Sequence, residues 1–298
     1  MESDGESAAR PASVDDGTQA SPARAVDEAL EREYNLRIRH PERGAAYDDY
    51  RRRSVALRER ETEHRARRYG EAANCVIDFF PARVVAPAPL FVFIHGGYWR
   101  ALDRGIFSFL ARPWLDRGVH VAMPGYDLAP AVSVRAIADQ IHAALDGLLG
   151  DAAALQIDAT RCIVGGHSAG AHLGALVLSE KRKGSAIGFV GVSGIYALAP
   201  LLSTSINFDV RLDADEARAL SPSPARADRA TRYLCAVGGA ETDGFRRQTH
   251  DYVAALRERG CHARSLEVPG RTHFDVLDDL ADADAGLFRS AFALLSPA

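Results

Sequence analysis

The chain has 298 residues, of which 47% are hydrophobic and 26% are charged, and its formal net charge is -4. These proportions are typical of a soluble globular protein. The mild acidity argues against a nucleic-acid or anionic-membrane partner, because proteins that bind such partners usually display a basic excess. No run of about 18 apolar residues occurs, so we expect no transmembrane helix.

The N-terminal quarter of the chain divides into a tail and a helical extension. Residues 1–24 are acidic and rich in Ser, Ala and Pro, without the apolar stretch of a signal peptide or membrane anchor. They hold too little apolar area to offset the entropy of ordering, so we expect a disordered tail. Residues 25–70 are rich in Arg and Glu. Because acids interrupt the basic run throughout, we interpret this segment as a helical extension with a solvated face.

After residue 70, strand-like and helix-like segments alternate. Helical periodicity places apolar residues on one stripe in 133–149 and in 243–260. Strands that alternate with helices predict a mostly parallel sheet with helices on both faces. We therefore expect one α/β domain over 25–298, in which 25–70 form the N-terminal extension. The apolar runs of strand length are CVIDFF (75–80), LFVFIH (90–95), VHVAMP (119–124), RCIVGG (161–166), IGFVGVSG (187–194), RYLCAVGG (232–239) and ARSLEV (263–268).

The strongest local motif is GHSAG (166–170), which lies between an apolar strand and an Ala/Leu-rich helix. This is the G-x-S-x-G nucleophile elbow in the strand–turn–helix context that it requires. Side chains two residues either side of Ser168 would collide with neighbouring backbone, which explains Gly166 and Gly170. The following helix directs its N-terminal N–H groups towards developing negative charge. A serine that merely caps its own helix is the structural alternative.

A nucleophilic serine needs a base, and the partners follow in the order acid, then histidine. His273 follows the last predicted strand and is our candidate base, whereas His250 lies in a helical pattern and His262 enters a strand. The acid should follow the strand at 232–239. Glu241 comes directly off that strand and is our preferred acid, with Asp243, two residues further on, as the alternative. The acid would hold the imidazole tautomer and stabilise the imidazolium.

The segment HGGYW (95–99) ends a buried strand with two bare glycines and two large rings. An oxyanion needs N–H donors from such a loop and from the residue after the nucleophile. We therefore predict an oxyanion hole made by the N–H groups of Gly96, Gly97 and Ala169. Tyr98 and Trp99 either form aromatic walls for an aryl substrate or pack in the core.

The sequence contains no motif that is typical of a metal or cofactor site. His167 and His172 are five residues apart, off a common helical face, and H-E-x-x-H is absent. No Rossmann or P-loop glycine pattern occurs. We expect no cofactor and no metal. The cysteines show neither disulfide nor metal spacing, which favours buried, reduced thiols and a reducing, cytoplasmic compartment. They are Cys75, Cys162, Cys235 and Cys261.

The order of several motifs resembles that of the arylformamidases, the kynurenine formamidases of the α/β-hydrolase superfamily, which are close to the hormone-sensitive-lipase-like esterases. The similarity extends from about Glu31 to the end of the chain. It implies the α/β-hydrolase fold, with Ser168 as nucleophile, His273 as base and Glu241 at the position of the acid, where animal relatives place aspartate. The matching segments are REYNLR (32–37), HGGYW (95–99), YDLAP (126–130), GHSAG (166–170), GIYALAPL (194–201), FRRQT (245–249) and THFDV (272–276).

The resemblance implies hydrolysis of N-formyl-L-kynurenine to L-kynurenine and formate, a step of tryptophan degradation, through a formyl-enzyme. A formyl group needs almost no acyl pocket, so specificity should lie on the leaving-group side. The second hypothesis is a carboxylesterase acting on small or aryl esters, since the same machinery cleaves esters. The third is a catalytically silent binding module of the same fold. The sequence does not indicate an oligomeric state.

Overall fold

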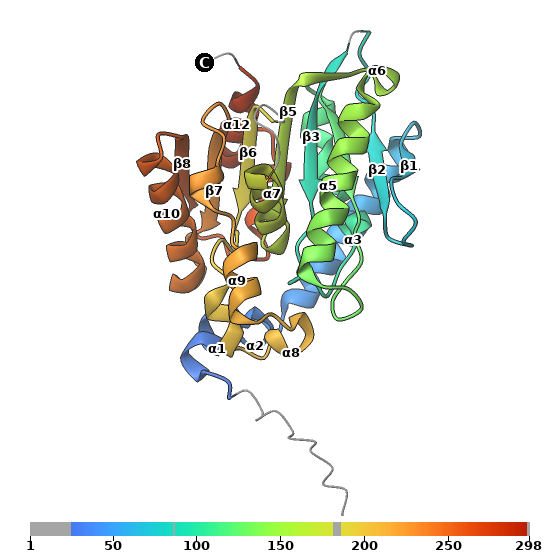
Figure 1. Ribbon diagram of the computed structural model, residues 1–298. Helices are drawn as coiled ribbons and strands as arrows, with labels where there is room; N and C mark the ends of the chain where they lie inside the picture. Colours follow the sequence, from blue (N-terminus) through green and yellow to red (C-terminus); the bar gives the residue numbers. More distant parts are fainter. Residues whose placement is uncertain (1–24, 86, 181–185, 297–298) are drawn as a thin grey trace, which may run out of the picture.

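The computed structural model describes residues 25–85, 87–180 and 186–296, and the tail predicted over 1–24 lies outside them. An eight-stranded sheet runs through the molecule in the order β1-β2-β4-β3-β5-β6-β7-β8 (Figure 1). β3 pairs in parallel with β4 and β5, and the parallel pairing continues to β8. The strands are β1 Arg65–Arg68, β2 Val76–Phe80, β3 Ala88–Ile94, β4 His120–Pro124, β5 Ile157–His167, β6 Gly188–Val192, β7 Arg232–Gly238 and β8 His262–Val268.

The alternating apolar segments predicted seven of these strands, and all seven are confirmed. β1 was not predicted, and it corrects the expectation that 25–70 would be helical throughout. Its sequence is RARR, with no apolar residue larger than alanine, and it lies at the edge of the sheet, antiparallel to β2. An edge strand can be held by backbone pairing on one side while its side chains face water. Hydrophobic periodicity therefore does not detect it.

One face of the sheet is covered by α5 (Val134–Gly150), α7 (Ala169–Glu180) and α10 (Asp243–Glu258), as the front layer of Figure 1 shows. The periodicity at 133–149 and 243–260 predicted α5 and α10, and both are confirmed. Below these helices lie η2 (Ala199–Ser203), α8 (Asn207–Val210), α9 (Ala214–Leu220) and η3 (Pro224–Arg226). α6 (Ala152–Leu155) precedes β5.

The opposite face is covered by helices from both ends of the described chain. From the N-terminal side come α3 (Arg43–Arg60), the 3₁₀ helix η1 (Arg104–Ala111) and α4 (Arg112–Leu115). From the C-terminal side come α11 (Val276–Ala281), α12 (Gly286–Phe292) and η4 (Ala293–Leu295). Two short helices, α1 (Glu28–Tyr34) and α2 (Leu36–Arg39), precede α3 at the carboxyl ends of the strands.

Buried hydrogen bonds attach the extension to the rest of the fold. The Ser54 hydroxyl donates to the carbonyl oxygen of Ile106 at 2.7 Å and accepts from the N–H of Phe109 at 3.1 Å. The Tyr50 hydroxyl donates to the carbonyl oxygen of Phe274. Because Phe274 follows His273 directly, α3 is bonded to the loop that carries the candidate base.

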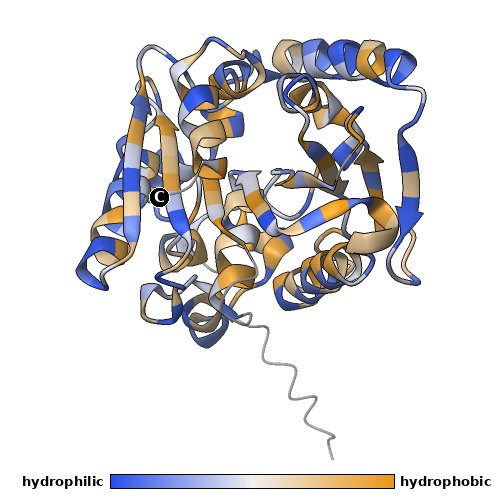
Figure 2. Cartoon of the chain, turned by 90° about the horizontal axis from the view of Figure 1, so that it is seen from above, coloured by the Kyte–Doolittle hydropathy of each residue, from blue (hydrophilic) through white to orange (hydrophobic). Residues whose placement is uncertain are grey.

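The core lies between the sheet and these two layers of helices. Seen from above in Figure 2, the inner strands are mainly orange and pale, whereas the strands at the two edges of the sheet and the outer sides of the helices carry much blue. β3 is buried along its whole length, as expected for a central strand covered on both faces. All four cysteines are buried and free, as predicted. Across 25–85, 87–180 and 186–296, no helix is long and apolar enough to span a bilayer.

Candidate active site

Ser168 occupies a sharp turn between β5 and α7. Its φ of 56° lies in the left-handed region, which an L-residue with a β-carbon rarely adopts. A β-carbon on Gly170 would lie 2.0 Å from the carbonyl oxygen of Ile94, and one on Gly166 would lie 2.4 Å from the backbone of Gly170. Only hydrogen fits at both positions, as the motif predicted. The turn holds the Ser168 hydroxyl above the end of the sheet.

His273 and Glu241 lie together at the same end of the sheet. Glu241 follows β7 directly, and His273 lies in the loop between β8 and α11. The Nδ1–H of His273 donates to Oε2 of Glu241 at 2.7 Å, and both side chains are buried. Asp243 is the first residue of α10, its side chain is 77% exposed, and it faces Arg246 at 3.5 Å. The structure thus brings Glu241, and not Asp243, to the imidazole.

The Glu241 carboxylate has two further donors. The Ser193 hydroxyl donates to Oε1 at 2.5 Å, and the N–H of Gly238 donates to the same oxygen at 2.8 Å. Ser193 directly follows β6, is fully buried and has a φ of 51°. Its role was not predicted from the sequence, because VSG at 192–194 is typical of the end of a strand. Its position beside Glu241 follows from the pairing of β6 with β7.

His167, the residue before Ser168, contacts the loop that carries His273. Its Nε2–H donates to the carbonyl oxygen of His273 at 3.0 Å, and the two ring centroids are 4.6 Å apart. Burial, together with the neighbouring His273 ring, lowers the pKa of His167 well below its ordinary value. The ring is therefore neutral and acts as a hydrogen-bond donor.

Ser168 and His273 line the same cavity, and no hydrogen bond joins the Ser168 hydroxyl to the imidazole among the described residues. Catalytic hydrogen bonds of this kind are often long without substrate and tighten when it binds.

The HGG segment turns sharply after β3. Gly97 has a φ of 116°, and a β-carbon there would lie 2.1 Å from the carbonyl oxygen of Ala101. The next two residues also have positive φ, 52° at Tyr98 and 56° at Trp99. Such consecutive strained residues cluster at functional loops. Within the described chain, the N–H groups of Gly96, Gly97 and Ala169 have no acceptor, so all three are free to bind an oxyanion.

His95 fixes the orientation of this loop. Its ring is buried, and Nδ1–H donates to the carbonyl oxygen of Gly96 at 2.8 Å. Burial lowers the pKa of His95 to about 4, so the ring is neutral. Because the C=O and N–H groups of a trans peptide point in opposite directions, holding the Gly96 carbonyl aims the N–H of Gly97 away from His95.

The two aromatic residues of HGGYW have different surroundings. Tyr98 lines the cavity, and its hydroxyl donates to the carbonyl oxygen of Tyr34 in the extension. Trp99 is fully buried and packs edge-on against His172 at 4.9 Å between ring centroids. Of the two interpretations, the cavity wall fits Tyr98 and core packing fits Trp99.

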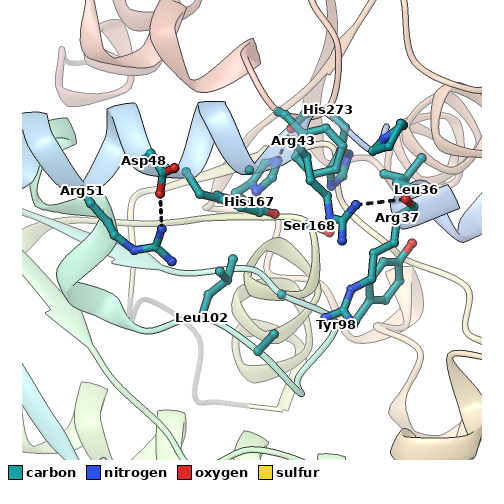
Figure 3. A pocket seen from close by; sticks show the side chains of 16 residues that line it. Leu36, Arg37, Arg43, Asp48, Arg51, Tyr98, Leu102, His167, Ser168 and His273 are labelled. Carbon is teal, nitrogen blue, oxygen red and sulfur yellow. Dashed lines mark hydrogen bonds and ion pairs between the residues drawn. The ribbon is translucent and has the colours of Figure 1, made fainter. Parts of the chain in front are cut away.

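The cavity measures about 310 Å³, which lies in the range of small-molecule sites. Figure 3 shows that the side chains around it come from both the extension and the hydrolase loops. No cluster of His, Cys, Asp or Glu that could hold a metal ion occurs in the part of the chain that the structure describes. The lining residues are Leu36, Arg37, Pro41, Arg43, Gly44, Tyr47, Asp48, Arg51, Gly97, Tyr98, Ala101, Leu102, His167, Ser168, His273 and Phe274.

The sequence of this chain is similar to those of known α/β hydrolases. Residues 91–228 match a family described as having the alpha/beta hydrolase fold. A kynurenine formamidase from Salmo salar is 31% identical over 228 residues, which cover 72% of this chain and 76% of the relative.

Solved structures agree on the fold. A crystal structure from a Silicibacter species, whose protein is assigned provisionally as a thioesterase, is 32% identical with a TM-score of 0.75 and covers 84% of this chain and 94% of its own. The thermostable carboxylesterase EstE1, from a metagenomic library, has a TM-score of 0.70 at 19% identity, over 87% of this chain and 98% of its own. At that identity the likeness extends to the fold alone.

Proposed function

The chain belongs to the kynurenine formamidase family of α/β hydrolases, and on that premise we propose that it hydrolyses N-formyl-L-kynurenine to L-kynurenine and formate. The observation that carries the proposal is the buried, hydrogen-bonded pair of Glu241 and His273, which lines one cavity with Ser168. We assign Ser168 as nucleophile, His273 as general base and Glu241 as the acid that orients it. The amides of Gly96, Gly97 and Ala169 form the oxyanion hole.

The first half of the reaction transfers the formyl group to the enzyme. Nε2 of His273 takes the proton of the Ser168 hydroxyl as Oγ attacks the formyl carbon. The carbonyl π electrons move to oxygen, and the resulting oxyanion accepts hydrogen bonds from the three free amides. The C–N bond then breaks while the imidazolium protonates the departing aryl amine. L-Kynurenine leaves, and a formyl ester remains on Ser168.

The second half releases formate. A water molecule gives a proton to His273 and attacks the formyl ester through a second oxyanion. The C–O bond to Ser168 breaks, and the imidazolium returns its proton to the serine oxygen. Glu241 stays ionised in both halves, because its role is to fix the Nδ1–H tautomer and to stabilise the imidazolium. The only reactants are the substrate and water.

We also propose that the protein works in a reducing, cytoplasmic compartment and binds neither nucleic acid nor membrane. Four free, buried cysteines support the compartment, and the slight acidic excess supports the absence of polyanionic partners.

Rates on N-formyl-L-kynurenine and on p-nitrophenyl acetate, measured side by side, test the proposal. We expect the larger kcat/KM for the formamide and loss of both activities in Ser168→Ala. A larger kcat/KM for the ester would instead assign the chain as a carboxylesterase. If neither compound is cleaved and Ser168→Ala changes nothing, the chain is a silent binding module.

A further inference from the structure

The wall of the cavity formed by the extension carries two arginine side chains without a carboxylate partner. Arg37 lies on α2 and Arg43 begins α3, and Figure 3 shows both beside Ser168 and Tyr98. Among the described residues, the Arg37 guanidinium has no hydrogen bond or ion pair. A guanidinium at a cavity wall is a strong donor with a preference for carboxylate and phosphate.

Arg43 is held in place by backbone oxygens. Its Nη1 donates to the carbonyl oxygens of Arg37 at 2.9 Å and of His40 at 3.1 Å. These bonds use one end of the planar group and leave the full positive charge without a counterion. The other arginine of the cavity differs, because Arg51 donates to Asp48 at 2.7 Å and is neutralised by it.

The surroundings of Arg37 add further positive charge. Burial and the neighbouring guanidinium groups of Arg100 and Arg43 lower the pKa of Arg37 below its ordinary value. The nearby carboxylate, Asp209, is bonded to Arg100, whose side chain is only 9% exposed. Of these three arginines only Arg100 has an ion pair among the described residues, and an anionic ligand would relieve the repulsion between Arg37 and Arg43.

We propose that Arg37 and Arg43 form an anion subsite that binds the carboxylate of an amino-acid-type leaving group while its formamide lies at Ser168. The subsite rests on the proposed function, and it deepens that function by naming the residues that bind the far end of the substrate. A formyl group offers almost no surface to recognise. Selection of the substrate therefore depends on the leaving-group side, where this charge lies.

A pair of substrates that differ only in the amino-acid group tests the subsite. N-formyl-L-kynurenine carries the carboxylate, and N-formyl-2-aminoacetophenone keeps the aryl ketone without it. We expect the ratio of kcat/KM for the compound with the carboxylate to that for the compound without it to fall roughly 10- to 100-fold in the double variant Arg37→Gln/Arg43→Gln, chiefly through KM. Arg39→Gln removes one positive charge at an exposed position of α2 outside the cavity and should keep the ratio of the unaltered protein.

These experiments distinguish a failure of the subsite proposal from a failure of the proposed reaction. The subsite would be refuted if the double variant kept this kcat/KM ratio within two-fold of the unaltered protein. It would also be refuted if Arg39→Gln lowered the ratio equally. Neither result would contradict formamide hydrolysis itself. If the unaltered protein cleaves no formamide, the proposed function fails, and 3-acetoxybenzoate against phenyl acetate provides the same charged and neutral comparison. Circular dichroism identifies a misfolded double variant. If the double variant is misfolded, the single variant Arg37→Gln tests the subsite, because the Arg37 side chain makes no hydrogen bond or ion pair among the described residues.

Discussion

Replacing Glu241 by glutamine removes one charge without changing the shape of the side chain. The carboxylate accepts from His273 Nδ1 at one oxygen and from Ser193 and Gly238 at the other. A carboxamide has one oxygen and one NH₂ group, so it must place a donor against one side. The backbone N–H of Gly238 cannot change its role, whereas an imidazole can change its tautomer. The amide oxygen should therefore keep Ser193 and Gly238, and the NH₂ group should face His273.

This arrangement moves the imidazole proton to Nε2, the atom that must accept the proton of Ser168. A similar acid-to-amide change in a serine protease lowers kcat by about 10⁴, because it traps the wrong tautomer. We expect Glu241→Gln to lower kcat for N-formyl-L-kynurenine by about 10³ to 10⁴, which corresponds to about 4 to 5.5 kcal/mol of transition-state stabilisation. KM should change little, since Glu241 does not line the cavity.

Steady-state kinetics on the purified variants, with folding checked by circular dichroism, provide the measurement. Asp243→Asn is the matched control: its side chain is exposed at the start of α10, and kcat should stay within about two-fold. Loss of activity in Asp243→Asn with a retained rate in Glu241→Gln would refute the assignment of the acid and the argument from tautomers together.

Other substitutions probe the neighbouring parts of the site and fold. Ser193→Ala removes one donor from Glu241 and should lower kcat about ten-fold at constant KM; an unchanged kcat would contradict its positioning role. Gly97→Ala should lower kcat about 100-fold by displacing an oxyanion amide. As its control, Gly147→Ala in exposed helix, with no atom within 4 Å of the new carbon, should raise the free energy of unfolding by about 0.5–1 kcal/mol in urea. Burial lowers the pKa of His172 from 6.5 to about 4, so the unfolded chain binds its proton first on acidification. Protonation of this one ring should therefore lower the free energy of unfolding by about 3 kcal/mol between pH 7 and 4, and urea unfolding of His172→Gln should lack this part of the slope.

Periodicity and local motifs in the sequence predicted the central architecture well. Seven strands and two long helices follow from apolar patterns, because residues buried on a sheet face or a helix stripe must be apolar. The glycines around Ser168 and at 96–97 were predicted for a local reason, since crowding within a turn depends on adjacent residues. β1 escaped prediction because its charged side chains face water and only its backbone pairs.

Features that depend on contacts between distant segments could not be predicted from the sequence. Ser193 meets Glu241 because β6 lies beside β7, and nothing near residue 193 signals this contact. The basic run of the extension was interpreted as a solvated face. Many of its arginines do face water, but Arg43 and Arg51 line the cavity because α3 crosses the end of the sheet that carries Ser168.

The attachment of α3 to the loop after His273 has a consequence for biosynthesis. Tyr50 on α3 is translated 224 residues before Phe274, which follows the proposed base directly. A nascent chain that ends before residue 273 therefore contains the proposed nucleophile, but neither the proposed base nor the carbonyl group that Tyr50 binds. On the proposed assignment, hydrolysis therefore requires the loop after β8 to pack against a segment translated long before it.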